Sequence, residues 1–164
     1  MVILNLPRIC RNANRKGNFA VPLSIDFKAG DKIIINGAVI ENLGSNSKLS
    51  VHNHAAILRG KEILSAEDSN TPASRIYFAL QCAYIFPHND GEYIEAYNKF
   101  LDEYLTACPS AMPIGEKVRE FVGGGQLYRA LKEAQKLIQH EGEVLKSLGQ
   151  ELESSAVAEE GDTA

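Results

Sequence analysis

The sequence predicts an α+β protein: a small antiparallel β-sheet or partly closed barrel in the N-terminal half, followed by an α-helical C-terminal half of about four helices. Three observations support this prediction. Asn36-Gly37 stands between apolar β-forming residues, which predicts a two-residue type I′ hairpin. Leu23, Ile25 and Phe27 alternate with polar residues at the strand period of two. From residue 71 onward, apolar residues instead recur at the helical spacing of three and four.

The predicted β unit spans residues 21–64. Polar, Gly-containing turns divide it into short apolar stretches, and each stretch has the length of a strand. A lone hairpin is marginally stable in water, so this sheet must pack on itself or on the helices. The predicted strands are 23–28, 32–35, 38–42, 48–52 and 56–58, with 61–64 as a further short candidate.

The predicted helical unit spans residues 65–152 and packs on the β unit. Its first helix begins at Thr71-Pro72, with Thr as the N-cap and Pro at the first helical position. This helix ends near Phe86 and is apolar almost all the way round, which is typical of a central, buried helix. Asn89, with Glu92 three residues later, predicts a capping box at the start of the second helix.

Two further helices are predicted, over 113–122 and from residue 126 to about 152, separated by the hinge Gly123–Gly125. The last helix carries apolar residues at heptad spacing, and Glu141 alone interrupts them. This spacing is compatible with a coiled-coil partner helix, but core packing of the first half with a projecting second half is the simpler interpretation. Residues 153–164 are small and acidic, which predicts a disordered tail.

The sequence predicts a cytoplasmic protein with reduced thiols. No apolar run approaches the ~20 residues that span a membrane, and the short apolar start of the chain does not resemble a signal peptide. Cysteines at positions 10, 82 and 108 are odd in number and widely spaced.

Charge is distributed unevenly along the chain. Residues 1–64 hold nine Lys and Arg against four Asp and Glu, a balance of +5, and residues 65–164 hold eight against seventeen, a balance of −9. Four of the basic residues lie in residues 1–20, which have no continuing apolar period and predict a flexible basic extension. The positive first half suits an anionic partner, although a solvated surface often has the same composition.

No motif indicates catalysis or a bound cofactor. His52 and His54 lie on one face of a predicted strand, but no further His or Cys follows at metal-ligand spacing. Gly123–Gly125 lacks the strand and the Lys-Ser/Thr ending of a phosphate-binding loop. The sequence therefore predicts a protein that is not an enzyme, with no catalytic residue, no metal site and no cofactor.

Basic residues near the strand ends are the candidate RNA contacts. Lys28 and Lys32 flank the first turn, and Arg59 and Lys61 bracket Gly60. If the sheet closes, these four cations could share one edge and contact phosphates. From residue 22 to 64 the β unit has no aromatic residue besides Phe27, whose alternation places it in the core, so RNA binding is possible but not required.

Taken together, these segments resemble the FlbT family of flagellar biosynthesis regulators, from about residue 22 to 148. Several separate motifs occur in the family's order, which makes the resemblance specific. They are Phe27-Lys28-x-Gly-Asp-Lys32, Asn36-Gly-Ala-Val39-x-x-Asn42, Ala56-Ile-Leu-Arg59 with Ile63-Leu64, Thr71-Pro-Ala73 with Arg75-Ile-Tyr-Phe78, and Tyr128-x-Ala-Leu131 with Lys136-Leu-Ile138 and Glu141.

The resemblance implies a cytoplasmic post-transcriptional repressor. Such a protein associates with the 5′ untranslated region of flagellin mRNA, promotes its degradation, and is opposed by a small partner called FlaF. An alternative is a protein-interaction module that binds flagellin or FlaF and affects mRNA indirectly, with Arg75, Leu145 and Leu148 as candidate partner contacts. The oligomeric state is not predicted.

The chain departs from the family pattern at three places along its length. Gln135 and His140 stand where Arg and Tyr are expected, and Ser74 is inserted at the start of the first helix. Family members also begin near Val21, so we expect residues 1–20 to be an artefact of start-site assignment.

Overall fold

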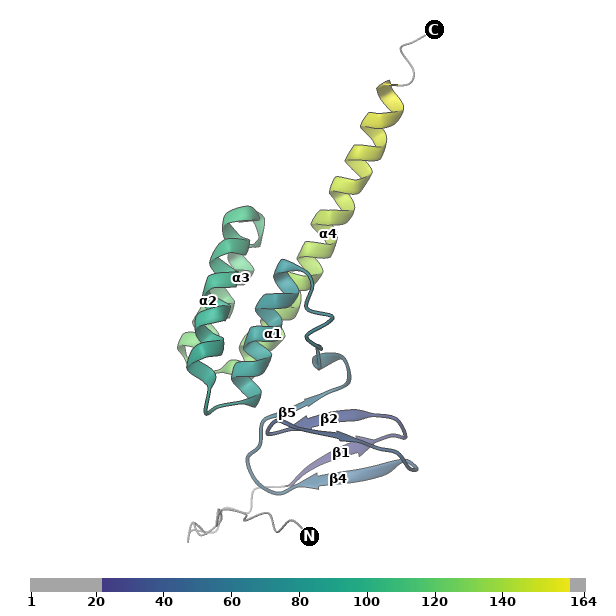
Figure 1. Cartoon of the computed structure of the whole chain (residues 1–164), viewed down its shortest axis with the longest axis vertical. Coiled ribbons are helices and arrows are strands. Elements are labelled where there is room, and N and C mark those ends of the chain that lie inside the picture. Colours follow the sequence, from purple (N-terminus) through teal and green to yellow (C-terminus); the bar gives the residue numbers. More distant parts are fainter. Residues whose placement is uncertain (1–21, 160–164) are drawn as a thin grey trace, which may run out of the picture.

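A computed structural model describes residues 22–159, with side chains described through residue 150. The β unit lies at one end of the molecule and the helices at the other (Figure 1). The predicted extension over residues 1–20 and the last five residues, 160–164, lie outside the described residues. In chain order the elements are β1 (Leu23–Phe27), β2 (Lys32–Ile35), β3 (Ala38–Glu41), β4 (Ser47–Val51), β5 (Ile57–Arg59), η1 (Gly60–Glu62), α1 (Pro72–Ile85), α2 (Asp90–Ala107), η2 (Pro109–Ala111), α3 (Met112–Gly123) and α4 (Leu127–Glu159).

The α+β prediction is confirmed, and the five strands form two antiparallel sheets rather than a closed barrel. One sheet pairs β1 with β4, and the other has the order β3-β2-β5. Ile25, Phe27 and Ile33 are buried between the two sheets. Because successive strand residues point to opposite faces, Ile34 and its cross-strand partner Leu58 face the helices instead. The β3-β2-β5 sheet is therefore the layer that joins the two units.

The Asn36-Gly37 hairpin forms as predicted between β2 and β3. Both residues have positive φ, 48° for Asn36 and 85° for Gly37, as a type I′ turn requires. The Asn36 N–H donates to the Ala56 carbonyl at 2.9 Å, and the Asn36 side-chain oxygen accepts from the Ala56 N–H at 2.8 Å. A Cβ at Gly37 would lie 2.7 Å from the Phe86 ring, so this turn also packs tightly against the end of α1.

Helix α1 is central and buried, as predicted, and packs against both α2 and α4. Its N-cap is Thr71, whose side-chain oxygen accepts from the Ser74 N–H at 3.2 Å. The Ser74 hydroxyl in turn accepts from the Thr71 N–H at 2.8 Å and completes a capping box. The Ser74 that departs from the family pattern therefore stabilises the start of α1.

The predicted short strand over residues 61–64 is wrong, because the chain there forms the 3-10 turn η1. Gly60 has φ of 52°, which lets the chain turn directly after β5. The Arg59 N–H then donates to the Glu62 carboxylate at 3.2 Å, and the Ile63 N–H donates to the Gly60 carbonyl at 3.1 Å. These hydrogen bonds use the backbone donors of residues 59 and 63 within the turn, so the segment does not pair with another strand.

The predicted capping box at Asn89 is also wrong. Asn89 precedes α2, but its side chain makes no capping hydrogen bond. Its ψ of 18° differs from the extended conformation in which a capping side chain reaches the next turn. Its N–H instead donates to the Phe86 carbonyl at 3.0 Å, in the turn that joins α1 to α2.

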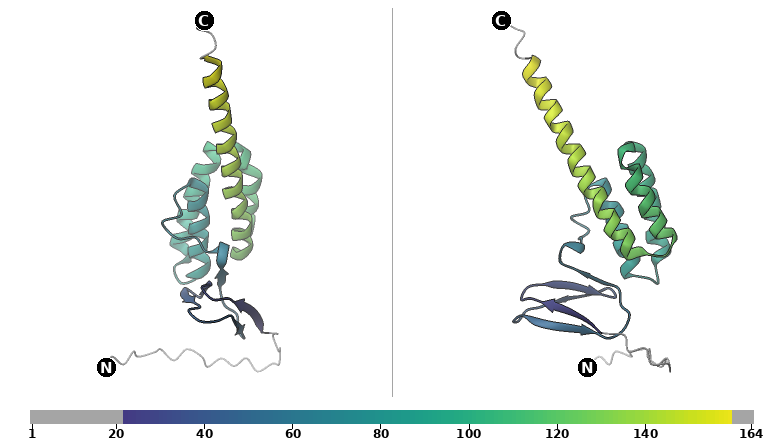
Figure 2. Two further views of the ribbon diagram at one scale, coloured as in Figure 1. Left: turned by 90° about the vertical axis from the view of Figure 1, so that its right-hand side faces the viewer. Right: turned by 180° about the vertical axis from the view of Figure 1, so that it is seen from behind.

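Helix α4 continues to Glu159, whereas the sequence placed its end near residue 152. Its first half packs against α1 and α3, and its second half projects beyond the other helices (Figures 1 and 2). Within the described residues, no helix combines the length and the apolarity needed to cross a bilayer.

Candidate nucleic-acid interface

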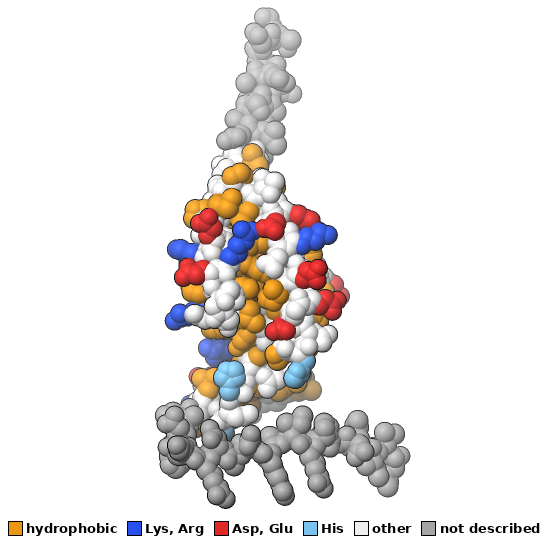
Figure 3. All heavy atoms as spheres, turned by 90° about the vertical axis from the view of Figure 1, so that its left-hand side faces the viewer, with side chains coloured by type: hydrophobic (Ala, Val, Ile, Leu, Met, Phe, Trp, Pro, Cys, Tyr) orange, Lys and Arg blue, Asp and Glu red, His pale blue; other side chains and the backbone are white. Residues whose placement is uncertain are grey.

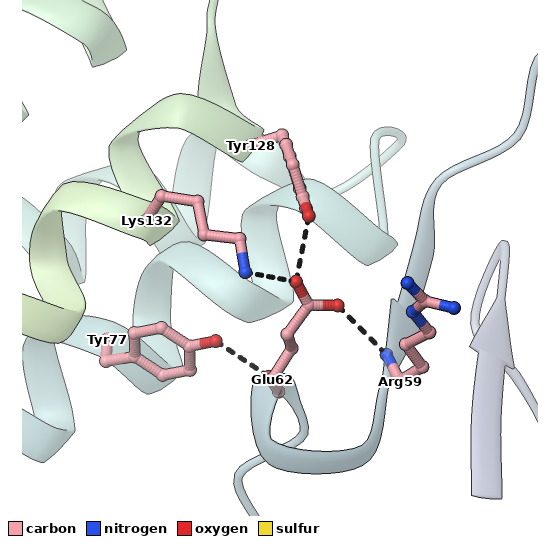
Figure 4. A network of polar contacts seen from close by, with 5 residues as sticks. All are labelled: Arg59, Glu62, Tyr77, Tyr128 and Lys132. Atoms are coloured by element: carbon pink, nitrogen blue, oxygen red, sulfur yellow. Dashed lines mark hydrogen bonds and ion pairs between the residues drawn. The ribbon is translucent and has the colours of Figure 1, made fainter.

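Glu62 connects the β unit to the helices (Figure 4). Its carboxylate accepts hydrogen bonds from the Tyr128 hydroxyl at 2.8 Å and from the Lys132 ammonium, both on α4. The other carboxylate oxygen accepts from the Arg59 N–H. The Tyr77 hydroxyl, from α1, donates to the Glu62 carbonyl at 2.7 Å. Four groups from three elements therefore converge on one residue of η1.

The protonation states of this network follow from burial and pairing. Burial favours a raised pKa for Glu62, but the hydrogen bonds from Lys132 and Tyr128 outweigh it and lower the pKa below 4.5. The same contact with Glu62 raises the pKa of Lys132. Burial raises the pKa of Tyr77 to about 12, so its hydroxyl keeps its proton. At neutral pH the junction thus contains a charged Glu62–Lys132 pair.

Two more α1 side chains hold the backbone of the β unit. Gln81 is buried and binds Leu64 twice: its amide oxygen accepts from the Leu64 N–H, and its amide nitrogen donates to the Leu64 carbonyl, both at 2.8 Å. The Tyr84 hydroxyl accepts from the Ile57 N–H at 3.2 Å. These contacts fix β5 and η1 against the helical unit.

A cleft of about 340 Å³ lies beside this junction, between β1, β5 and the helices. Arg59, Glu62, Tyr84 and Tyr128 line it together with residues 23–25 of β1. Tyr128 is 41% exposed, and its ring centroid lies 5.8 Å from that of Tyr84. We refer to this cavity as the junction cleft.

The four cations that were predicted to share one edge lie in different settings, and Arg59 and Lys32 leave the sheet on opposite faces. Arg59 lies directly opposite Ile33 in the β2–β5 register, so its side chain leaves the sheet on the same face as Ile33. Lys32 precedes Ile33 and therefore leaves on the other face. There Lys32 forms an ion pair with Glu41 at 3.7 Å. Arg59 is thus the predicted cation that lines the junction cleft.

Lys61 and Lys28 are exposed but lie in different settings. Lys61 follows Arg59 by two residues and lies on η1, near the cleft. Lys28 lies in the turn after β1, where its N–H donates to the Asp31 carboxylate at 2.8 Å.

Across residues 22–64, five Lys and Arg stand against four Asp and Glu, so the positive balance of the first half arises mainly from residues 1–20.

Sequence reasoning missed the aromatic side of the junction cleft. It noted that the β unit lacks exposed aromatics, whereas the structure brings Tyr84 and Tyr128 to it from α1 and α4. Tyr128 was part of a family motif, but its contact with Glu62 joins residues far apart in the sequence. Such a long-range pair leaves no periodic signal.

A second hollow lies on the helical unit and brings together two of the three predicted partner contacts. It has a volume of about 280 Å³ and includes both Arg75 and Leu145, while Leu148 lies one turn further along α4. Leu145 and Leu148 are 60% and 49% exposed. We refer to this hollow as the α2–α4 groove; it is lined by Pro72, Arg75, Phe100, Glu103, Tyr104, Ala107, Cys108, Glu141, Val144 and Leu145.

Glu141 interrupts the apolar seam of α4 because it caps another helix. Its side chain is 8% exposed, and one carboxylate oxygen accepts from the Ala73 N–H at 3.1 Å. This N–H belongs to the first turn of α1, where backbone donors lack helical partners and negative charge is favoured.

The two histidines of the possible metal pair are exposed. The His52 ring nitrogen Nε2 lies 3.0 Å from the Ser50 hydroxyl. Across the described part of the chain, no three His, Cys, Asp or Glu side chains gather in a way that could hold a metal ion.

Comparison with known proteins identifies the family. The model of the family "Flagellar protein FlbT" matches residues 23–145. The probable flagellum biosynthesis repressor protein FlbT 1 of Bradyrhizobium diazoefficiens is 38% identical over 73% of this chain and 82% of its own length. The probable repressor FlbT of Rhodopseudomonas palustris strain TIE-1 is 36% identical over 76% and 98%, respectively. The flagellum biosynthesis repressor FlbT of Caulobacter vibrioides strain ATCC 19089 is 29% identical over 87% and 99%.

No solved structure matches the chain significantly. The motifs at the hairpin, at the start of α1 and at the Tyr128–Leu131 turn all lie within the matched range. The chain therefore belongs to the FlbT family of flagellar proteins.

Proposed function

We propose that this protein regulates flagellum biosynthesis in the cytoplasm by associating with the 5′ untranslated region of flagellin mRNA. Association promotes degradation of the mRNA and so represses flagellin synthesis. The names of the relatives, flagellum biosynthesis repressors, support the regulatory role. The observation that carries the RNA contact is the junction cleft, where Arg59 lies with two tyrosines.

The chemistry of the cleft suits a single RNA strand. Proteins bind such strands by combining cations for the phosphates with aromatic rings for the bases. Arg59 and Lys61 are exposed and form no ion pair with another described residue. The carboxylate in the cleft, Glu62, is already neutralised by Lys132. Lys28 and Lys32 do not line the cleft, and Lys32 leaves the sheet on the opposite face from Arg59. In this proposal they contact a separate stretch of the RNA.

In this proposal the protein performs no chemistry on the RNA. Binding changes the access of cellular ribonucleases to the message, and the helices recruit a partner. The protein therefore acts as a scaffold without a catalytic residue or cofactor of its own.

A gel-shift titration with the flagellin 5′ untranslated RNA tests the proposal. We expect affinity to fall as salt rises, and the double substitution Arg59→Ala, Lys61→Ala to reduce the salt slope by about one per lost phosphate contact. Lys48→Ala is the matched control, because Lys48 lies on β4 and pairs with Asp26 at 3.8 Å. Binding that is undetectable, insensitive to salt, or equally weakened by the control rejects the proposal.

A second candidate is a protein-interaction module that binds flagellin or FlaF, with an indirect effect on mRNA. The α2–α4 groove favours it, because an exposed apolar hollow with Arg75 at its rim suits a protein ligand. A pull-down with purified flagellin and FlaF after ribonuclease treatment separates the two candidates. Retention that survives the treatment, together with absent RNA binding, supports the second.

A further inference from the structure

The two halves of α4 differ in their surroundings. In the first half, Ala130, Leu131, Ala134 and Leu137 are each at most 1% exposed, because α1 and α3 cover them. In the second half the helix extends past the end of the bundle (Figure 2). A helical segment without tertiary packing is marginally stable in water. A packing partner would therefore stabilise the projecting half.

Over residues 142–150 the projecting half has an apolar face without a charged residue, and Glu151, seven residues after Val144, is the first charge on that side. Val144, Leu145 and Leu148 recur at helical spacing on one side, continuing the seam of the buried half. At 100° per residue, Glu143 and Lys146 fall on the side away from these residues. Gly149 lies beside Leu148 and has nothing within 4 Å of an added Cβ, so a second helix can approach closely there.

The α2–α4 groove adjoins this face and shares Val144 and Leu145 with it. Hydrophobic side chains also form an exposed strip between charged ones on the helical unit (Figure 3). Three charged residues line the groove. Arg75 and Glu103 are exposed and have opposite signs, whereas Glu141 is buried and accepts from the Ala73 N–H. The exposed charges therefore cancel, and the groove suits an occupant that is mainly apolar, such as the projecting face of α4.

We propose that two copies of this chain associate about a two-fold axis, with the apolar face of each α4 covering the α2–α4 groove of the other copy. In a two-fold dimer one surface must be complementary to itself. This chain meets that condition because the groove and the apolar face adjoin on one side of the molecule. The dimer buries both surfaces at once, and the inference does not rest on RNA binding.

Sedimentation velocity of the full chain, from low to high micromolar concentration, tests the proposal. We expect a monomer–dimer equilibrium that Leu148→Lys weakens about ten- to a hundred-fold, the effect of exposing one buried leucine. Ala107→Lys, on the groove side, should weaken it similarly, because each substitution affects a different half of the same contact. Both positions are exposed in the single chain, so the fold, checked by circular dichroism, should be unchanged.

Leu43→Lys is the matched control, because Leu43 is 90% exposed in the loop after β3, outside the groove. A wild-type chain that stays monomeric throughout overturns the proposal, and so does a dimer that neither Leu148→Lys nor Ala107→Lys weakens. If flagellin or FlaF occupies the groove instead, the wild-type chain should be a monomer that binds one of these proteins, and Leu148→Lys should abolish that binding. This result also rejects the dimer.

Discussion

The β unit and the helical unit achieve order in different ways. The helical unit has a continuous apolar core drawn from α1, α2, α3 and α4. The β unit has three buried side chains of its own between its sheets, Ile25, Phe27 and Ile33. Two strands that pair only with each other are marginal without further support. We therefore expect the helical unit to be the more stable of the two, and the β unit to depend on contacts with it for its stability.

Polar contacts supply much of what the small β core lacks. The Asn42 side chain donates to the Phe27 carbonyl at 2.8 Å and to the Ser45 carbonyl at 2.9 Å, which ties the two sheets together. At the other end, Gln81 and Glu62 attach the β5–η1 segment to the helices. The contrast predicts that damage to the helices spreads to the sheets, but not the reverse.

The largest effect is expected from Leu80→Ala. Leu80 is fully buried in the core around α1, so its truncation should cost about 2–5 kcal/mol of unfolding free energy. Amide hydrogen exchange should show lost protection in both units. In the matched variant Ile33→Ala, the amides of the two sheets should lose protection from exchange while those of α1 and α4 keep it. Equal loss of helical protection in Ile33→Ala contradicts the dependence of one unit on the other.

The next largest loss of unfolding free energy is expected from Glu141→Ala. It leaves the Ala73 N–H buried without an acceptor, which costs about 1–3 kcal/mol. Glu141→Gln keeps an acceptor oxygen and should cost less. Urea unfolding measures both variants, and equal losses would show that the capping hydrogen bond is not the cause.

Protonation of Glu62 at low pH should have a smaller effect and lower the free energy of unfolding by about 1 kcal/mol. Because the folded pKa of Glu62 is lowered, its contribution is fully present above the ordinary value of 4.5 and is lost as pH falls through the folded value. Acid should therefore loosen β5 and η1 before the helical core, which NMR hydrogen exchange can follow. Glu62→Gln should remove this pH dependence of exchange. If the variant retains it, a group other than Glu62 is responsible.

The smallest effect is expected at the edge strand β3. Val39 is 67% exposed, so Val39→Thr should change the unfolding free energy by about 0.5 kcal/mol or less. Thermal unfolding measures the change. A larger loss would indicate that β3 contributes more to the β unit than its exposure implies.

The elements that sequence alone predicted correctly are those encoded by near neighbours. Asn36-Gly37 specifies its turn through backbone preference, and Thr71-Pro72 specifies a helix start through a local hydrogen bond. Asn89 misled because its side-chain type permits capping while its backbone is held in a turn. The class of fold followed from these local signals and from periodicity.

The candidate site was harder to predict, because its parts come from distant segments. Arg59 and Lys61 were identified as cations, but Tyr84, Tyr128 and Glu62 meet through tertiary packing. Glu141 appeared as an interruption in an apolar seam, and its role became visible once α1 lay beside it. No local pattern encodes such pairs.

The placement of Glu62 has a mechanical consequence. Its two α4 partners, Tyr128 and Lys132, lie in the first turns of that helix, whose 33 residues then extend for about 50 Å. A change of about 5° in the angle between the sheets and this helix would shift the far tip of α4 relative to the sheets by roughly 4 Å, given a rise of 1.5 Å per residue. Because α1 and α3 hold the first half of α4, such a change would tilt the β unit against the helical unit as a whole.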